Sequence, residues 1–173
     1  MIKTLYLAGG CFWGTQKYFD LLRGVVSTEV GYANGGTTAP TYEDVKHGSG
    51  HAETVKVTFD DSVLPPETLL AHYFLTVDPV SVDRQGGDAG HQYRTGVYYD
   101  DESLLPAIRA SFAKTEAELG AKPATELLPL ENFFPAEEYH QKYLEKNPGG
   151  YCHLPAVLFE KAKSSLPFSR EKE

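Results

Sequence analysis

The spacing of hydrophobic and polar positions predicts a series of strands and helices along the chain. A β-like run at 3–8 is followed by a segment at 15–22 in which Tyr18, Leu21 and Leu22 recur at helical spacing. Further strands are predicted at 24–33, 51–59, 93–99 and 124–128, and further helices at 65–77, 103–119 and 136–146. This order predicts an α+β fold, a split β-α-β (ferredoxin-like) sandwich with a mixed or antiparallel sheet and packed helices.

Residues that favour turns separate these elements. Loops are predicted at 34–40, 41–45 and 80–92. Residues 147–150 read Asn-Pro-Gly-Gly, which ends the last helix, and the chain beyond them is predicted to be irregular with a charged, loose end. Because no repeat or linker divides the sequence, residues 1–173 are expected to form one domain, with an irregular tail over about 147–173.

Glu53 occupies an unusual position in the predicted strand 51–59. The alternation of this strand places Glu53 on the same face as Val55, Val57 and Phe59. Burial among apolar side chains raises the pKa of a carboxyl group, so Glu53 could stay protonated and donate a hydrogen bond. The alternative is a glutamate at the end of a strand that is exposed to water.

Cys11 lies at a predicted turn between a strand and a helix. Gly10 and Gly14 flank it and allow a tight backbone path. The free N–H groups of a helix start favour a thiolate, which predicts a reactive cysteine. The alternative is a small, buried and inert side chain.

The composition excludes several classes of protein. The formal net charge of -8 and the lack of a basic cluster argue against nucleic-acid binding. No run of about eighteen apolar residues predicts a membrane span, and the first residues do not resemble a secretory signal, so a cytoplasmic location is expected. Two cysteines are too few for a disulfide scaffold. No apolar patch is evident, and a monomer is the base expectation.

Cys152 lies in a segment that is predicted to lack regular structure. Glycines precede it and Pro155 follows it. A thiol on a mobile loop can attack an oxidised partner, because a cysteine sulfenic acid condenses with a second thiol to form a disulfide. The alternative is an inert loop cysteine.

Three further residues are candidates for hydrogen bonds to a substrate. Tyr42 and Tyr93 lie in or beside loops next to strands, where their phenols could donate to an oxyanion or simply fill the core. Asp88 lies in a glycine-rich loop and could orient a tyrosine or a water, or cap a turn.

The six histidines show no metal-binding spacing, so a structural zinc site is not expected. A Cys-His pair for acyl transfer stays open, since His51, His91 or His140 could approach Cys11 in space.

Several motifs together resemble the A-type peptide methionine sulfoxide reductases. They occur in the family's order along the chain: Gly10-Cys11-Phe12-Trp13-Gly14, Pro40-Thr41-Tyr42, Gly50-His51-Ala52-Glu53, Asp88 with His91-Gln92-Tyr93-Arg94, and Asn147-Pro148-Gly149-Gly150-Tyr151-Cys152.

The resemblance implies a role for each matching side chain. Cys11 would be the nucleophile that attacks the sulfoxide sulfur, and Glu53 the protonated acid that donates to the sulfoxide oxygen. The other implied site residues bind the substrate: Phe12 and Trp13 as an apolar pocket for its methyl group, Tyr42 and Tyr93 as hydrogen-bond donors, and Asp88 as an organiser of the site.

The resemblance also implies the cycle and its partners. Oxygen transfer would leave methionine and a sulfenic acid on Cys11, Cys152 would close a Cys11–Cys152 disulfide, and thioredoxin or a dithiol would reduce it. The substrate would be methionine-S-sulfoxide, free or in proteins, and no metal or organic cofactor is implied. Some family members carry another cysteine after the equivalent of Cys152, and this tail has none.

Besides a reductase and a Cys-His acyl-transfer enzyme, a third hypothesis is a non-catalytic module that binds proteins containing methionine sulfoxide through Phe12 and Trp13.

Overall fold

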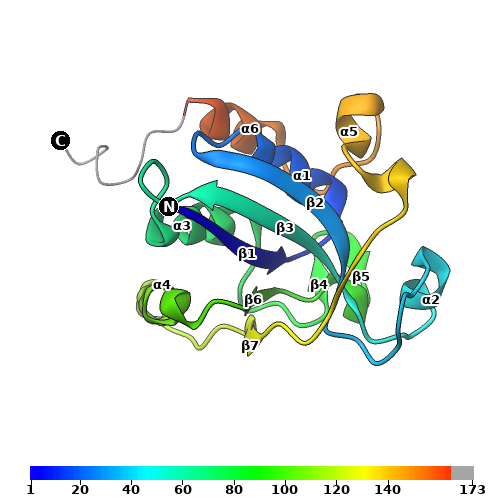
Figure 1. The fold of residues 1–173 in the computed structure, drawn as a ribbon, viewed down its shortest axis with the longest axis horizontal. Coiled ribbons are helices and arrows are strands. Elements are labelled where there is room, and N and C mark those ends of the chain that lie inside the picture. Colours follow the sequence, from blue (N-terminus) through cyan, green and yellow to red (C-terminus); the bar gives the residue numbers. More distant parts are fainter. Residues whose placement is uncertain (165–173) are drawn as a thin grey trace.

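A six-stranded mixed sheet forms the centre of the computed structural model, which describes residues 1–164. Its strands are β1 (Ile2–Ala8), β2 (Val25–Ala33), β3 (Ala52–Asp60), β6 (Gly96–Tyr99), β7 (Glu126–Pro129) and β8 (Phe133–Pro135). They lie in the order β7-β6-β1-β3-β2-β8, and all neighbours are antiparallel except β6 and β7. The predicted mixed sheet with packed helices is confirmed (Figure 1).

Four helices pack on one face of the sheet and enclose the main core. They are α1 (Phe12–Asp20), α3 (Pro66–Thr76), α4 (Leu105–Leu119) and α6 (Ala156–Lys163). The buried side chains that they share with the sheet include Leu5, Leu7, Phe19, Val55, Val57, Phe59, Leu70, Ile108 and Phe159. Each fully buried side chain of this size contributes about 1.5–3 kcal/mol, so this face supplies most of the hydrophobic stabilisation.

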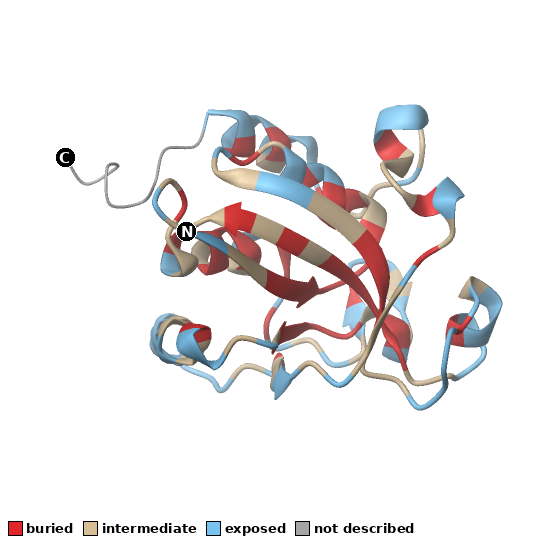
Figure 2. Ribbon diagram, in the orientation of Figure 1, coloured by how far each residue is buried: buried red, intermediate tan, exposed pale blue. Residues whose placement is uncertain are grey.

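The opposite face has a smaller cluster of Tyr6, Ala8, Ala33, Ala52 and Tyr98, covered by Leu130 and Phe133. β3 is buried along most of its length, and both β1 and β2 change from exposed or half-buried at their starts to buried towards Ala8 and Ala33 (Figure 2). The well-packed end of β2 therefore meets the ends of β1 and β3, and this end of the sheet carries the candidate site.

Two loops were predicted where the structure has short regular elements. Residues 42–46 form α2 (Tyr42–Lys46), which begins with a capping box between Thr41 and Asp44. The loop at 80–92 contains a hairpin of β4 (Arg84–Gln85) and β5 (Asp88–Ala89). The predicted strand 93–99 begins only at Gly96, because residues His91–Tyr93 form a 3-10 turn.

The single helix predicted at 136–146 is wrong. The segment forms a 3-10 turn at Glu138–His140 and a short helix α5 (Tyr143–Lys146). Tertiary contacts override its helical propensity: the Gln141 amide exchanges two hydrogen bonds with the Val30 backbone, and Lys142, at φ 54°, donates its N–H to Gln16.

The prediction of an irregular tail over 147–173 is correct only up to Pro155. The next eight residues form α6, whose Phe159 and Ala162 are buried against the core. The end of the predicted tail, residues 165–173, lies outside the described residues. No helix within residues 1–164 has both the length and the apolar character to cross a bilayer.

Candidate active site

Cys11 lies at the turn where β1 ends and α1 begins, as the sequence predicts. It is the N-cap residue of α1, with φ -64° and ψ 124°. Gly10 before it has φ +76°, a conformation that favours glycine, and its N–H donates to the Tyr93 carbonyl at 3.1 Å. The Thr15 hydroxyl donates to the Cys11 carbonyl at 3.4 Å. These contacts fix the backbone on both sides of the thiol.

Glu53 is buried directly beside this helix start. Its side chain is 2% exposed, so the alternative of an exposed strand-end glutamate is excluded. The Phe12 N–H donates to Oε1 at 3.3 Å and the Gln92 amide donates to Oε2 at 2.7 Å. Burial raises the pKa of Glu53 to about 7, although these two donors oppose the rise. At neutral pH the carboxyl group is therefore available in its protonated form.

The Cys11 thiol is protonated in the resting site. Burial raises its pKa, the charges of Glu53 and Asp88 raise it further, and only the Trp13 backbone N–H lowers it. The expectation that the helix start favours a thiolate is therefore wrong for the resting protein. The cost of placing a charge in this buried position outweighs the favourable helix start.

Tyr42 and Tyr93 lie on different elements and both face the Glu53 region. Burial is the main cause that raises the pKa of each phenol, and the Glu53 charge is the second. Both hydroxyls therefore keep their protons at neutral pH and can donate hydrogen bonds. The structure thus gathers Cys11, Glu53, Tyr42 and Tyr93 in one site.

Phe12 and Trp13 are placed differently. Phe12 is 1% exposed and its ring lies against Tyr32 and His140. Trp13 is partly buried, stacks on Tyr143 with ring centroids 3.6 Å apart, and donates its indole N–H to His140 Nδ1 at 2.9 Å. Trp13 is therefore held in a fixed orientation and stays partly exposed, whereas Phe12 belongs to the packed interior.

Glu137 joins two aromatic residues of the site and was missed from the sequence. Its Oε1 accepts from the Tyr32 hydroxyl at 2.8 Å, and its Oε2 accepts from the Tyr42 N–H at 3.0 Å. These hydrogen bonds lower the Glu137 pKa against the effect of burial. The ionised carboxylate therefore ties the start of α2, which carries Tyr42, to the sheet.

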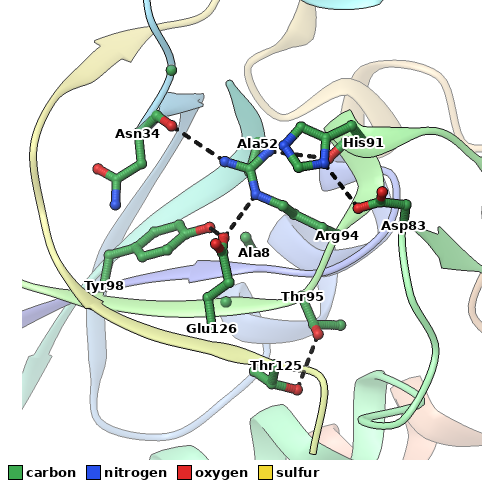
Figure 3. A network of polar contacts seen from close by, with 12 residues as sticks. Ala8, Asn34, Ala52, Asp83, His91, Arg94, Thr95, Tyr98, Thr125 and Glu126 are labelled. Carbon is green, nitrogen blue, oxygen red and sulfur yellow. Dashed lines mark hydrogen bonds and ion pairs between the residues drawn. The ribbon is translucent and has the colours of Figure 1, made fainter. Parts of the chain in front are cut away.

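Arg94 follows the turn that carries Tyr93, and Figure 3 shows the polar contacts of its guanidinium. The Arg94 guanidinium donates to Glu126 Oε1 at 2.7 Å, to the His91 carbonyl at 3.1 Å and to the Asn34 carbonyl at 3.2 Å. Arg94 is buried, and Glu126 also accepts from the Tyr98 hydroxyl. A partly buried, charge-assisted network of this kind holds the Tyr93 turn in place.

Cys152 lies in an irregular segment that packs on the first turn of α1. A side-chain carbon placed on Gly14 would lie 2.9 Å from Cys152 Sγ, so the thiol covers this helical turn. The neighbouring Tyr151 hydroxyl donates to Asp88 Oδ1 at 3.0 Å, which joins the segment to the hairpin loop. Both cysteines are free thiols.

The three histidines considered as partners for Cys11 have other contacts. His51 Nδ1 bonds with Ser49, His91 Nδ1 bonds with Asp83, and His140 Nδ1 accepts from Trp13. The histidine that packs beside the Cys11 turn is His153, which the sequence did not single out for this place. Within the described part of the chain, no three His, Cys, Asp or Glu side chains form a group that could hold a metal.

Comparisons with known proteins identify a family for the chain. The family model of peptide methionine sulfoxide reductase matches residues 3–171. The chain is 54% identical to the peptide methionine sulfoxide reductase MsrA of Lachnoclostridium phytofermentans, over 95% of this chain and all of that protein. It is also similar to reduced Mxr1 of Saccharomyces cerevisiae, with a TM-score of 0.83 and 34% identity over 87% of this chain and 88% of that one. Mxr1 in complex with Trx2 matches with a TM-score of 0.58 and 25% identity, over 82% and 84%.

Proposed function

We propose that this chain, which belongs to the peptide methionine sulfoxide reductase family, repairs oxidised proteins by reducing the S epimer of methionine sulfoxide. Family membership makes the chain an oxidoreductase that reduces methionine sulfoxide. The choice of epimer, the substrate free or within proteins, and the chemical cycle belong to the proposal. The observation that carries it is the buried Glu53, with a pKa of about 7, beside the Cys11 turn.

In the first step Cys11 attacks the sulfoxide sulfur while Glu53 donates its proton to the sulfoxide oxygen. The oxygen is a poor leaving group until it is protonated, and a buried neutral carboxyl supplies a proton where bulk water cannot. Tyr42 and Tyr93 donate hydrogen bonds to the same oxygen, and the partly exposed Trp13 binds the methyl group. Asp88 organises the site through Tyr151.

The protonated state of Glu53 before the transfer also assists the nucleophile. The Glu53 charge is one cause of the high Cys11 pKa, so Cys11 loses its proton most readily while Glu53 is neutral. The step transfers the oxygen to sulfur: Cys11 becomes a sulfenic acid and the sulfoxide becomes a thioether. The thiol proton of Cys11 replaces the proton that Glu53 gave, so no net proton is consumed.

Cys152 then closes a disulfide with Cys11 and releases water, and thioredoxin or another dithiol reduces the bond. The position of Cys152 Sγ over Gly14 supports this pairing, and the Mxr1 complex with Trx2 supports a thioredoxin partner. The cycle uses only thiols and needs no metal or organic cofactor. It suits a cytoplasmic monomer in which thioredoxin approaches the Cys11–Cys152 bond directly.

The central strands also support the finer description of the fold. The order β6-β1-β3-β2 of four antiparallel strands, with α1 and α3 as the intervening helices, is what a split β-α-β (ferredoxin-like) arrangement requires. The strands β7 and β8 would then be additions at its two edges.

The test mixes fully reduced protein with pure S or R methionine sulfoxide without a reductant. We expect about one methionine per chain from the S epimer only, and a loss of two hydrogen atoms in the intact mass. A Cys152→Ser control should release the same methionine and keep an added oxygen on Cys11. Equal reaction of both epimers, or methionine release without either mass change, contradicts the proposal.

A further inference from the structure

His153 lies against the two glycines that flank Cys11. A side-chain carbon on Gly10 would lie 2.7 Å from His153 Nε2, and one on Gly14 would lie 3.3 Å from His153 Nδ1. The same position on Gly14 lies 2.9 Å from Cys152 Sγ. The imidazole thus spans the turn that carries the nucleophile, and its Nδ1 faces the same small space as the second thiol.

Both ring nitrogens of His153 are buried and have no hydrogen-bond partner among the described residues. Leaving a buried polar group without a partner is costly, and such groups need an explanation. An unpaired imidazole that shares the space over Gly14 with the Cys152 thiol is placed to accept a proton from it.

The titration behaviour of the two neighbours is compatible with this exchange. Burial lowers the pKa of His153, so the ring is neutral and keeps a free lone pair. Burial raises the pKa of the Cys152 thiol, so this thiol keeps its proton until a base removes it. In the resting structure the Cys152 thiol donates to the Leu154 carbonyl at 3.6 Å. A backbone hydrogen bond with Leu154 lowers the Cys152 pKa, and Lys17 lowers it less, but neither a peptide group nor a protonated amine can accept the proton.

We propose that His153 is the general base of the resolving step, an inference that rests on the cycle proposed above. His153 takes the proton from the Cys152 thiol as Cys152 Sγ attacks the sulfur of the Cys11 sulfenic acid. The S–S bond forms, the S–O bond of the sulfenic acid breaks, and the oxygen leaves with the transferred proton as water. The imidazole returns to its neutral form, so atoms and charge balance without a further reactant.

The test separates the two chemical steps by rapid mixing and acid quench. Wild type, His153→Gln and His153→Asn are mixed with one equivalent of methionine-S-sulfoxide, and released methionine and the disulfide are followed separately. We expect methionine release at the wild-type rate in both variants and disulfide formation slowed by roughly 10²-fold. His47→Gln, at an exposed histidine outside the site, is the matched control and should change neither rate.

Chemical rescue distinguishes a base from a merely structural residue. His153→Ala leaves space beside Gly10 and Gly14, and added imidazole should restore its disulfide formation in proportion to the imidazole concentration. Disulfide formation at the wild-type rate in His153→Gln overturns the proposal. So does a loss in His153→Ala that imidazole does not restore while circular dichroism shows a folded protein.

A second set of experiments, with hydrogen peroxide in place of the sulfoxide, tests the role of His153 independently of the proposed function. One equivalent of hydrogen peroxide oxidises a Cys thiol to a sulfenic acid and water, so it forms the intermediate on Cys11 without a sulfoxide. If wild type releases no methionine but forms the disulfide from peroxide, the proposed function fails and the role of His153 is still measured. If wild type performs both steps and His153→Gln equals it, only the role of His153 fails.

Discussion

The surroundings of the two cysteines differ in almost every physical property. Cys11 follows a central strand, is 8% exposed, and has its backbone held through Gly10 and Thr15. Cys152 is half-buried in a segment without regular structure, between the four-residue helix α5 and the eight-residue helix α6. Segments with few backbone hydrogen bonds open more easily than core strands. The surroundings of Cys11 therefore fix its thiol, whereas Cys152 lies in a segment, residues 147–155, that can open more easily. We call residues 147–155 the mobile segment.

This difference matches what each thiol must do. A nucleophile that receives an oxygen atom needs a fixed position relative to the acid that protonates this oxygen, and Glu53 shares the site with Cys11 through the Phe12 N–H. A resolving thiol must approach after the substrate has left and then expose a disulfide to a protein reductant. The buried side chains of Leu144, Leu154 and Phe159 anchor the segment that carries Cys152 on both sides.

The largest expected effects separate the two cysteines. Cys11→Ser should reduce methionine formation to the background rate under all conditions, because a serine hydroxyl cannot accept the oxygen. Cys152→Ser should still release one methionine per chain but stall with thioredoxin. Turnover with thioredoxin and the S sulfoxide measures both. Full thioredoxin-linked activity of Cys152→Ser would remove Cys152 from the cycle.

Glu53→Gln should affect the oxygen-transfer step at Cys11 and not the later step at Cys152. The amide still accepts or donates hydrogen bonds but has no acidic proton, so we expect kcat to fall by about 10²–10⁴-fold with little change in KM. Steady-state kinetics with a small-molecule dithiol measure this without thioredoxin. Glu43→Gln, at an exposed residue of α2, is the control. An unchanged kcat in Glu53→Gln would show that another group supplies the proton.

The raised pKa of Glu53 also predicts a pH dependence of stability. The folded protein holds this proton up to about pH 7, whereas the unfolded chain loses it near 4.5. The proton is therefore bound more tightly by the folded state, and its stabilising effect is lost as the pH rises through 7. We expect Glu53→Gln to gain roughly 2–3 kcal/mol relative to wild type between pH 5 and pH 8.

Urea unfolding at the two pH values, with Glu43→Gln beside it, measures this effect. The same protonation equilibrium should make wild-type kcat fall above pH 7, since less Glu53 is protonated. A constant difference in unfolding free energy between wild type and Glu53→Gln would contradict a raised pKa at this position.

The sequence predicts the part of the site around Cys11 and Glu53 better than the segment that carries Cys152. Strand alternation places Glu53 on the buried face, and the glycines and helical spacing locate the Cys11 turn, because these signals are local. The capping box of Thr41 and Asp44 is likewise a local signal, and it marks the start of α2.

Other features depend on contacts that no local pattern contains. Glu137 reaches Tyr32 across 105 positions of sequence, and Gln141 pairs with the backbone of Val30 across 111. The second contact also ends the helix that the local propensity at 136–146 favours. The protonated state of the Cys11 thiol also depends on distant residues, since the charges of Glu53 and Asp88 add to the effect of burial on its pKa.

The smallest expected effect tests whether the packing of Cys152 and His153 against α1 positions the Cys152 thiol. Gly14→Ala improves helix propensity by about 1 kcal/mol, but its methyl group would lie 2.9 Å from Cys152 Sγ and 3.3 Å from His153 Nδ1. The Cys152 segment must therefore move, while the core around α1 stays in place. We expect unchanged methionine release in the first turnover and a disulfide that forms a few-fold more slowly.

In Gly14→Ala we also expect Cys152 to react faster with a thiol reagent, because the displaced segment exposes Sγ. Gly36→Ala is the control, since its added carbon would meet its nearest neighbour at 3.7 Å, an ordinary contact distance. If Gly14→Ala forms the disulfide at the wild-type rate, the packing on α1 does not position Cys152. Movement of the segment that carries Cys152 then limits the rate of disulfide formation. If methionine release slows as well, displacement of the mobile segment reaches the Cys11 turn.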